Sequence, residues 1–290
     1  MDTLIDAAAL KDQLDGARET GRRTVLLDVR WALGDPHGHD HYVREHIPGA
    51  VFVDLATELA GPAEPSRGRH PLPTPEQFQE SARRWGINDG DAVVAYDDSG
   101  NLAAARLWWM LRNSGFRSVH LLDGGLAAWR AAGFDLAAGA EQPAPGNVTL
   151  SEGAMPAIDA GQAATWGQRG LLLDARAGER YRGEIEPVDP RAGHIPGAVS
   201  APTTGNLQAD GRFLAPAELR ERFERLGYRT DVPTAVYCGS GVTAAHEIAA
   251  LEIAGFSAAL YPGSFSEWCH GASNEVVTGP EPYAADRASI

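Results

Sequence analysis

The chain has 290 residues, 43% of them hydrophobic and 22% charged, a composition typical of a globular protein with enough apolar material for two cores. Its formal net charge of −14 argues against nucleic acid or an anionic membrane as the main partner. The two cysteines, Cys238 and Cys269, are too few for a disulfide framework, so we expect a reducing, cytoplasmic location.

The first half of the chain alternates short apolar runs with helical patterns. Residues 1–20 are acidic and amphipathic and lack the basic start and apolar centre of a signal peptide. Strands are predicted at 24–28, 92–96 and 119–122, and a helix at 75–86, which has Pro near its start and Gly at its stop. The histidine-rich stretch 34–46 is predicted to be a loop. No run of about 18 apolar residues occurs, so we expect no membrane span.

A stretch rich in Ala, Gly and Pro follows at 137–157 and predicts an extended linker. We place the linker at 139–152. The expected N-terminal domain is then 1–138 and the expected C-terminal domain is 153–290.

The second half repeats the first. Four blocks recur in the same order at offsets of 146, 148, 141 and 139 residues, among them TVLLDVR with GLLLDAR and REHIPGAV with AGHIPGAV. Strands are predicted at 171–174, 234–237 and 258–261, and a helix at 216–227. Ordered matches of this length indicate a duplicated domain. Apolar strands alternating with helices predict an α/β fold with two tandem domains, each a parallel sheet flanked by helices on both faces.

The two copies differ most in one strand-to-helix loop. The first copy reads Tyr96, Asp97 and then DSGN, whereas the second reads Tyr237, Cys238 and then GSGVT. Both continue into an Ala-rich helix. The geometry is shared and the chemistry is not, so we interpret the first domain as a degenerate copy and the second as the one that carries the site.

Cys238 lies where a glycine-rich turn meets a helix N-terminus. Main-chain N–H groups of such a turn, together with the helix dipole, stabilise an anion, which for a cysteine is its thiolate or persulfide. The alternative is a small buried hydrophobe, the ordinary fate of a lone cysteine. A cysteine phosphatase would need an arginine six residues after the nucleophile, and Ala244 stands there. The loop therefore favours sulfur transfer.

At these residues the chain resembles the two-domain rhodanese-type sulfurtransferases. The resemblance rests on HIPGA in each half, RYRGEIEP at 180–187 and CGSGVT at 238–243, and it covers essentially the whole chain. The loop is most similar to that of 3-mercaptopyruvate sulfurtransferases, because thiosulfate-preferring members typically carry basic side chains within it. The resemblance implies an inactive N-terminal copy, an active C-terminal copy and no cofactor.

The family mechanism implies that Cys238 takes a sulfane sulfur from the donor as a persulfide and passes it to a thiol, cyanide or a thioredoxin-like protein. Ser240 would relay a proton to the leaving carbon, or it caps the following helix. His46 is a further possible site residue. The loop residues expected to hold substrate are Gly239, Gly241, Val242 and Thr243.

Two arginines match the substrate-binding arginines of that family. They are Arg180 and Arg191, and guanidinium groups suit a donor with a carboxylate and a ketone. Arg182 is a rival. The alternative interpretation of Arg180 is a surface arginine that forms an ion pair with Glu184 or Glu186 and binds no substrate.

Other polar residues have simpler interpretations. Asp174 and Arg176 recur as Asp28 and Arg30 in the copy without the thiol, so we expect a structural ion pair at the strand end. Cys269 has no helix start behind it and is expected to be packed incidentally. The histidines near residue 40 lack diagnostic ligand spacing, so no metal site is predicted.

Two alternatives to a mercaptopyruvate enzyme stay open at this point. One is a thiosulfate:cyanide sulfurtransferase using the same cysteine. The other is a persulfide carrier that serves a protein acceptor and turns over small donors poorly.

Overall fold

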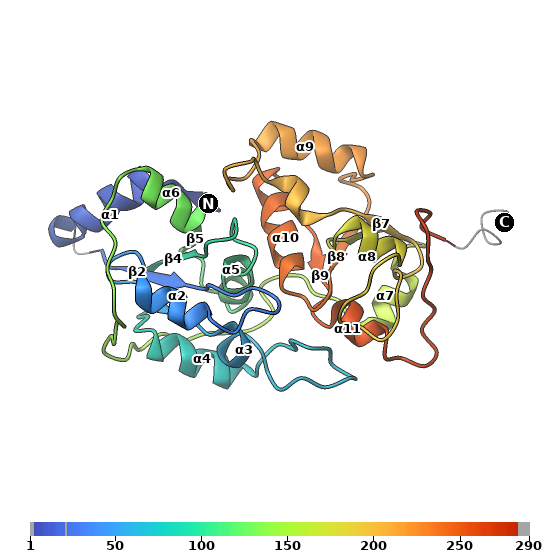
Figure 1. Ribbon diagram of the computed structural model, residues 1–290, viewed down its shortest axis with the longest axis horizontal. Coiled ribbons are helices and arrows are strands. Elements are labelled where there is room, and N and C mark those ends of the chain that lie inside the picture. Colours follow the sequence, from blue (N-terminus) through green and yellow to red (C-terminus); the bar gives the residue numbers. More distant parts are fainter. Residues whose placement is uncertain (1–2, 21, 284–290) are drawn as a thin grey trace. The chain divides into compact units, whose positions relative to one another are not determined.

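The computed structural model describes residues 3–20 and 22–283, which form two compact units (Figure 1). Unit 1 comprises Met1–Gly61, Pro73–Met155 and Leu207–Phe213, and unit 2 comprises Pro62–Leu72, Pro156–Asn206 and Leu214–Ile290. Two short segments are thus exchanged relative to the linear division expected from the sequence. The exchange matters for function because Pro62–Leu72 brings side chains from the first half of the chain into unit 2.

Unit 1 contains a five-stranded sheet in the order β1-β5-β4-β2-β3, and its strand pairs are all parallel. Its strands are β1 (Leu4–Ile5), β2 (Thr24–Asp28), β3 (Val51–Phe52), β4 (Ala92–Tyr96) and β5 (Val119–Leu122). Its helices are α1 (Ala7–Thr20), α2 (Gly38–Arg44), α3 (Leu55–Glu58), α4 (Pro75–Arg84), α5 (Ala104–Asn113) and α6 (Gly125–Ala131).

Helices cover both faces of this sheet. On one face, Leu10 of α1 and Trp129 of α6 share a hydrophobic core with Leu26 of β2 and Val94 of β4. On the opposite face α5 packs against β4 and β5. Because the central strands β2 and β4 are covered on both sides, nearly all their residues are buried and apolar without alternation, which explains why their sequence runs were recognisable.

The predicted loop at 34–46 is wrong, because residues Gly38–Arg44 form helix α2. Tyr42 is 1% exposed and donates its hydroxyl proton to the carbonyl of Ala50, which anchors this helix on the unit. Asp35, just before the helix, accepts a hydrogen bond from the N–H of His37. Tertiary packing of one aromatic side chain therefore overrides the turn-forming Gly, Asp and Pro residues of the stretch.

Unit 2 repeats the arrangement with a four-stranded parallel sheet in the order β7-β6-β8-β9. Its strands are β6 (Leu171–Asp174), β7 (Ala198–Ser200), β8 (Thr234–Tyr237) and β9 (Ala259–Leu260). Its helices are α7 (Ala160–Trp166), α8 (Gly178–Arg182), the 3₁₀ helix η1 (Thr203–Asn206), α9 (Pro216–Arg225), α10 (Thr243–Ile253) and α11 (Ser264–Trp268).

The two sheets correspond strand by strand, β2 to β6, β3 to β7, β4 to β8 and β5 to β9. The register agrees as well, since Leu27 pairs with Val51 and Leu173 pairs with Val199. In place of β1, unit 2 has a single parallel bridge to β9. The duplication predicted from the sequence is therefore confirmed in the fold.

The segment between the repeats, expected to be a linker, contains no helix or strand at 139–152. It runs along unit 1, with the N–H of Gly146 bonded to the carbonyl of Arg83 and the N–H of Val148 to that of Ile87. Val148 is fully buried. Among the described residues, no helix is both long and apolar enough to cross a bilayer.

Candidate active site

Cys238 is the first residue after β8, which lies between β6 and β9 in the sheet of unit 2. The loop then leads into α10 at Thr243. The carboxyl ends of parallel strands gather at this edge, which is the usual place of a site in an open α/β sheet. Cys238 is 2% exposed and lies in no disulfide.

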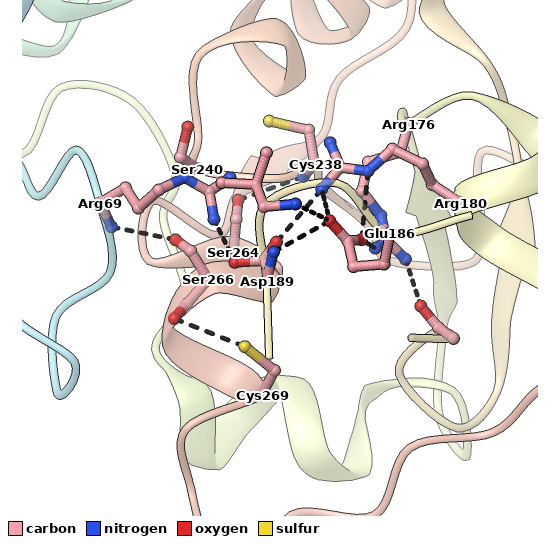
Figure 2. A network of polar contacts seen from close by, with 12 residues as sticks. Arg69, Arg176, Arg180, Glu186, Asp189, Cys238, Ser240, Ser264, Ser266 and Cys269 are labelled. Carbon is pink, nitrogen blue, oxygen red and sulfur yellow. Dashed lines mark hydrogen bonds and ion pairs between the residues drawn. The ribbon is translucent and has the colours of Figure 1, made fainter. Parts of the chain in front are cut away.

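The loop is held in shape around the sulfur. Gly241 has φ +77°, a left-handed conformation that suits glycine, and its N–H donates to Sγ of Cys238 at 3.1 Å. The N–H of Cys238 donates to Oγ of Ser264 at 3.1 Å, and its carbonyl accepts from the N–H of Phe265. Both sides of the cysteine are thus fixed by the turn that begins α11 (Figure 2).

Further loop amides are available for an anion. Within residues 3–20 and 22–283, the N–H groups of Ser240, Val242 and Ala244 make no hydrogen bond. Amides at the start of a helix have no partner within the helix, and they readily bind negative charge.

The matching loop of unit 1 shows what such amides do. The carboxylate of Asp97 accepts hydrogen bonds from four main-chain N–H groups, those of Ser99, Asn101, Ala103 and Ala104, at 2.9, 2.7, 2.8 and 3.0 Å. Asp97 is fully buried. In unit 1 the loop amides therefore bind a carboxylate of the chain itself; burial raises the pKa of Asp97, and these hydrogen bonds oppose that rise.

A histidine that the sequence analysis missed reaches this loop. Nδ1 of His70 lies 2.8 Å from Oγ of Ser240. His70 belongs to the exchanged segment Pro62–Leu72, and 170 positions separate it from Ser240. Val242, the N-cap residue of α10, makes no side-chain capping hydrogen bond. The hydroxyl of Ser240 therefore contacts a group able to carry a proton, as the proton-relay interpretation requires.

Arg180 lies at the loop in an ion-pair network (Figure 2). Its Nε and Nη2 bind Glu186 at 3.1 and 2.6 Å, and Nη2 also contacts Asp189 at 3.2 Å. The ion pair with Glu186 agrees with the alternative interpretation of Arg180 as a structural residue. The side chain is not on the surface, however, because it is only 15% exposed. Its Nη1 would lie 3.3 Å from a Cβ built on Gly239, so it contacts the loop. Arg182, the rival, pairs instead with exposed Glu184.

Burial and ion pairing shift the two carboxylates of this network in opposite directions. Burial alone would raise the pKa of Glu186, but hydrogen bonds from Arg180 and from the N–H of Asp189 hold that pKa below its usual range. Burial raises the pKa of Asp189 in spite of its arginine partners. Glu186 is thus the more firmly ionised of the pair.

Arg69, a second residue that the sequence analysis missed, joins the network from the exchanged segment. Its side-chain Nη1 forms an ion pair with Asp189, and its main-chain N–H donates to Oγ of Ser266 at 3.1 Å. Asp189 therefore bridges Arg69 and Arg180 (Figure 2). Nothing in the local sequence of Arg69 marks it, because proximity to the loop arises only in the fold.

The other predicted residues have different surroundings. Nη1 of Arg191 donates to the carbonyl of Asn274 at 2.8 Å. His46 stacks on Tyr42 within unit 1 and its Nδ1 lies 3.0 Å from the carbonyl of Tyr42, an arrangement repeated in unit 2 by His194 on Tyr181. This repetition favours a structural role for both histidines.

The expected strand-end ion pairs are confirmed in both units. Asp174 binds Arg176 and Asp28 binds Arg30, each at 2.6 Å, and each arginine also donates to a main-chain carbonyl. Cys269 is 3% exposed in the core of unit 2, and burial together with the charge of Asp189 raises the pKa of its thiol to about 11. Its packing agrees with the incidental role expected for it.

The histidine-rich segment pairs with its own carboxylates, His37 with Asp40 and His41 with Asp35. In the part of the chain that the structure describes, no group of three or more His, Cys, Asp or Glu side chains is arranged to hold a metal ion.

Fold and site together define a duplicated α/β protein in which one copy presents a cysteine in an anion cradle. The family model for the rhodanese-like domain matches residues 6–132 and 158–270. A Pseudomonas aeruginosa protein named "Probable 3-mercaptopyruvate sulfurtransferase" is 48% identical over 94% of this chain and 99% of its own length. The chain therefore belongs to the rhodanese family, as a two-domain sulfurtransferase.

Two further comparisons agree with this assignment. A Mycobacterium tuberculosis protein named "Putative thiosulfate sulfurtransferase SseB" is 44% identical over 92% of this chain and 95% of its own. The crystal structure of the 3-mercaptopyruvate sulfotransferase SseA from Escherichia coli superposes with a TM-score of 0.80 at 31% identity, over 91% of this chain and 99% of that one. The names of these relatives thus divide between two sulfur donors.

Proposed function

We propose that this sulfurtransferase takes sulfur from 3-mercaptopyruvate through a persulfide on Cys238. The Cys238 thiolate attacks the donor sulfur, a sulfur–sulfur bond forms, and the carbon–sulfur bond breaks with its electron pair on carbon. The carbon then takes a proton, so that the donor thiol's proton ends in the methyl group of pyruvate and the persulfide carries the negative charge.

The observation that carries this proposal is the binding of Asp97 in unit 1. One atom separates its carboxylate oxygens from Cβ, and the same number would separate the outer sulfur of a Cys238 persulfide from Cβ. Four main-chain N–H groups bind those oxygens. Three of the corresponding amides of unit 2, those of Ser240, Val242 and Ala244, are suited to hold the outer sulfur as an anion, which lowers the energy of the intermediate; the fourth, that of Ala245, donates to the carbonyl of Val242.

Donor binding follows from the charges around the loop. Arg180 offers Nη1 beside Gly239, and we assign to it the carboxylate of the donor. Arg191 is proposed as the second donor-binding arginine, and main-chain groups of Gly239, Gly241, Val242 and Thr243 complete the site. Ser240, in contact with His70, is proposed to deliver the proton to carbon.

The acceptor is proposed to be a thiol, cyanide or a thioredoxin-like protein, which removes the outer sulfur and restores the thiolate. A reducing cytoplasm is the proposed location, since a chain with two cysteines has no disulfide framework to maintain.

Intact mass spectrometry tests the proposal directly. After incubation with 3-mercaptopyruvate, the protein should gain the mass of one sulfur atom and lose it again on addition of reduced thioredoxin. Cys238→Ser should gain none and should release no pyruvate. Cys269→Ser is the matched control and should behave like wild type, because its buried thiol is protonated. Full activity of Cys238→Ser would rule the proposal out, and sulfur that leaves only to a protein acceptor would indicate a carrier.

A further inference from the structure

A guanidinium group from outside the catalytic loop lies against it. Nη2 of Arg69 would be 3.1 Å from a Cβ built on Gly239, and Nη1 of Arg180 would be 3.3 Å from it. Gly239 is not among the glycines with a left-handed backbone, so its conformation does not require glycine. A side chain at this position would press both guanidinium groups back by a few tenths of an ångström, so glycine lets them lie directly against the loop. The loop is neutral in sequence, but its surroundings are not.

The backbone that carries Arg69 is fixed in place. Gly68 has φ +87°, and a Cβ there would lie 2.7 Å from both the carbonyl oxygen of Gly263 and Oγ of Ser266. The next N–H, that of Arg69, donates to the same Oγ at 3.1 Å. The segment therefore packs tightly on the turn that also supports Cys238, and the position of Arg69 is a built feature of the site.

Arg69 retains unused hydrogen-bonding capacity. Its Nη1 binds Asp189, while its Nε is buried without a partner and its Nη2 makes no hydrogen bond among the residues described. Arg180 uses Nε and Nη2 on Glu186 and Asp189 and likewise leaves Nη1 beside Gly239. A buried guanidinium nitrogen without an acceptor is costly unless a ligand supplies one. These donors therefore suit a ligand with several anionic oxygens.

We propose that Arg69 determines the donor range of the enzyme by admitting thiosulfate, a dianion with three terminal oxygens, to a loop that has no basic side chain. This inference rests on the proposed persulfide chemistry of Cys238. The thiolate attacks the outer sulfur of thiosulfate, the sulfur–sulfur bond of the donor breaks with its electron pair on the sulfite, and a new sulfur–sulfur bond forms at Cys238. Charge balances and no proton moves.

The two donors thus depend on different residues. Sulfite departs with its double negative charge, which Arg69 and Arg180 together would stabilise. Pyruvate departs as a carbanion equivalent that needs a proton, for which Ser240 and His70 are placed, and its single carboxylate is assigned to Arg180. Arg69 therefore contributes more to thiosulfate turnover than to mercaptopyruvate turnover.

The test compares kcat/KM for both donors in wild type, Arg69→Ala and Arg69→Lys. The matched control is Arg67→Ala, since Arg67 is exposed on the same segment and donates to the carbonyl of Leu72. In Arg69→Ala we expect kcat/KM for thiosulfate to fall about 10-fold or more, the effect of one lost hydrogen bond to a charged group, with less than about a threefold fall for mercaptopyruvate. Arg69→Lys should recover part of the thiosulfate rate, and Arg67→Ala should match wild type.

An equal fall for both donors in Arg69→Ala and Arg69→Lys would overturn the inference, because it would indicate a purely structural role. An unchanged thiosulfate rate in Arg69→Ala would overturn it too. The mercaptopyruvate rate of each variant reports on its folding. Failure of the proposed function is distinguishable, because it would appear in wild type as no sulfur gained from 3-mercaptopyruvate. A wild type that gains sulfur from 3-mercaptopyruvate but none from thiosulfate would instead overturn the inference about Arg69.

Discussion

Asp97 and Cys238 occupy the same position in the two copies of one strand–loop–helix unit, and both face amides of their loop. Within the described chain, the Asp97 carboxylate accepts four main-chain hydrogen bonds, whereas Sγ of Cys238 accepts one, from Gly241. One copy has thus turned the cradle into a permanent internal contact. In the other copy the amides of Ser240, Val242 and Ala244 make no hydrogen bond among the described residues, which suits the transient sulfur anion proposed for Cys238.

The Asp97 contacts predict a large stability effect in the copy without the thiol. Asp97→Ala should lower the free energy of unfolding by about 3 kcal/mol, because it leaves several buried N–H groups without an acceptor. Thermal and urea denaturation measure the change. Asp98→Ala is the matched control, since Asp98 is exposed next in the chain and should have little effect. Equal stability of the two variants would contradict the assignment of Asp97 as a structural anion.

The contact between Ser240 and His70 predicts a donor-dependent loss of activity. Ser240→Ala and His70→Gln should each lower kcat with mercaptopyruvate about 100-fold or more, since a positioned acid or base usually contributes about 10²- to 10⁴-fold. Thiosulfate turnover should change little, because sulfite needs no proton to depart. The double variant should be no slower than the slower single variant, since both residues serve one proton transfer.

Steady-state assays with the two donors check this prediction. If the two losses multiplied in the double variant, Ser240 and His70 would act separately. If thiosulfate turnover fell equally, their contact would serve only to hold the loop, whichever donor is used.

The sequence predicted the central strands to within a residue because they are apolar on both faces. TVLLD and AVVAY coincide with β2 and β4, and TAVY coincides with β8. The edge strands β1 and β3 were missed, since two residues are too short for a pattern. The duplicated order of the blocks carried the fold class, because a repeated sequence folds into a repeated sheet.

The candidate site was predictable only for residues that lie close together in the sequence. Cys238, its loop and the start of α10 are consecutive, so the cradle could be inferred from glycine and helix patterns. Arg69 and His70 come from a segment without helical or strand periodicity, and only the exchange of Pro62–Leu72 into unit 2 brings them to the loop. The contact of Arg191 could not be predicted for the same reason, since its guanidinium group donates to the main-chain carbonyl of Asn274, 83 positions along the chain.

The backbone conformation of Ser264 leads us to expect different stabilities for two substitutions that both remove its hydroxyl. Its φ is +54°, strained for serine, and the matching residue of unit 1 is Gly125 at φ +55°. The hydroxyl offsets this strain by accepting from the N–H of Cys238 and donating to the carbonyl of Tyr261. Ser264→Gly relieves the strain whereas Ser264→Ala keeps it, so the alanine variant should be less stable by about 1 kcal/mol.

Denaturation midpoints of the two Ser264 variants measure this difference in stability. Both variants should also form the Cys238 persulfide more slowly than wild type, because the loop loses its hydrogen bond to the Ser264 hydroxyl. Wild-type rates of persulfide formation in both variants would show that the hydroxyl does not position Cys238. Greater stability of the alanine variant would show that the backbone there is not strained.

The ion pair of Glu186 predicts how stability depends on pH. Burial raises its pKa, but hydrogen bonds from Arg180 and from the N–H of Asp189 outweigh burial, so the folded-state pKa lies below the ordinary value of 4.5. A depressed pKa stabilises the folded state above the unfolded value, and the contribution is lost as pH falls through the folded value.

Glu186→Gln should therefore unfold more easily than wild type at pH 7, by about 1 to 3 kcal/mol, because Arg180 loses the nearer of its two charged partners in a buried setting and keeps only Asp189. The gap between the two proteins should begin to narrow as the pH falls below 4.5, where the unfolded chain takes up the proton, and should close as the pH passes through the lower pKa of Glu186 in the folded protein. Glu184→Gln is the matched control, since Glu184 pairs with Arg182 at the exposed surface and should change stability little at any pH. Urea denaturation at a series of pH values measures the gap, and a gap that stays constant down to low pH would show that the charge of Glu186 does not stabilise the fold.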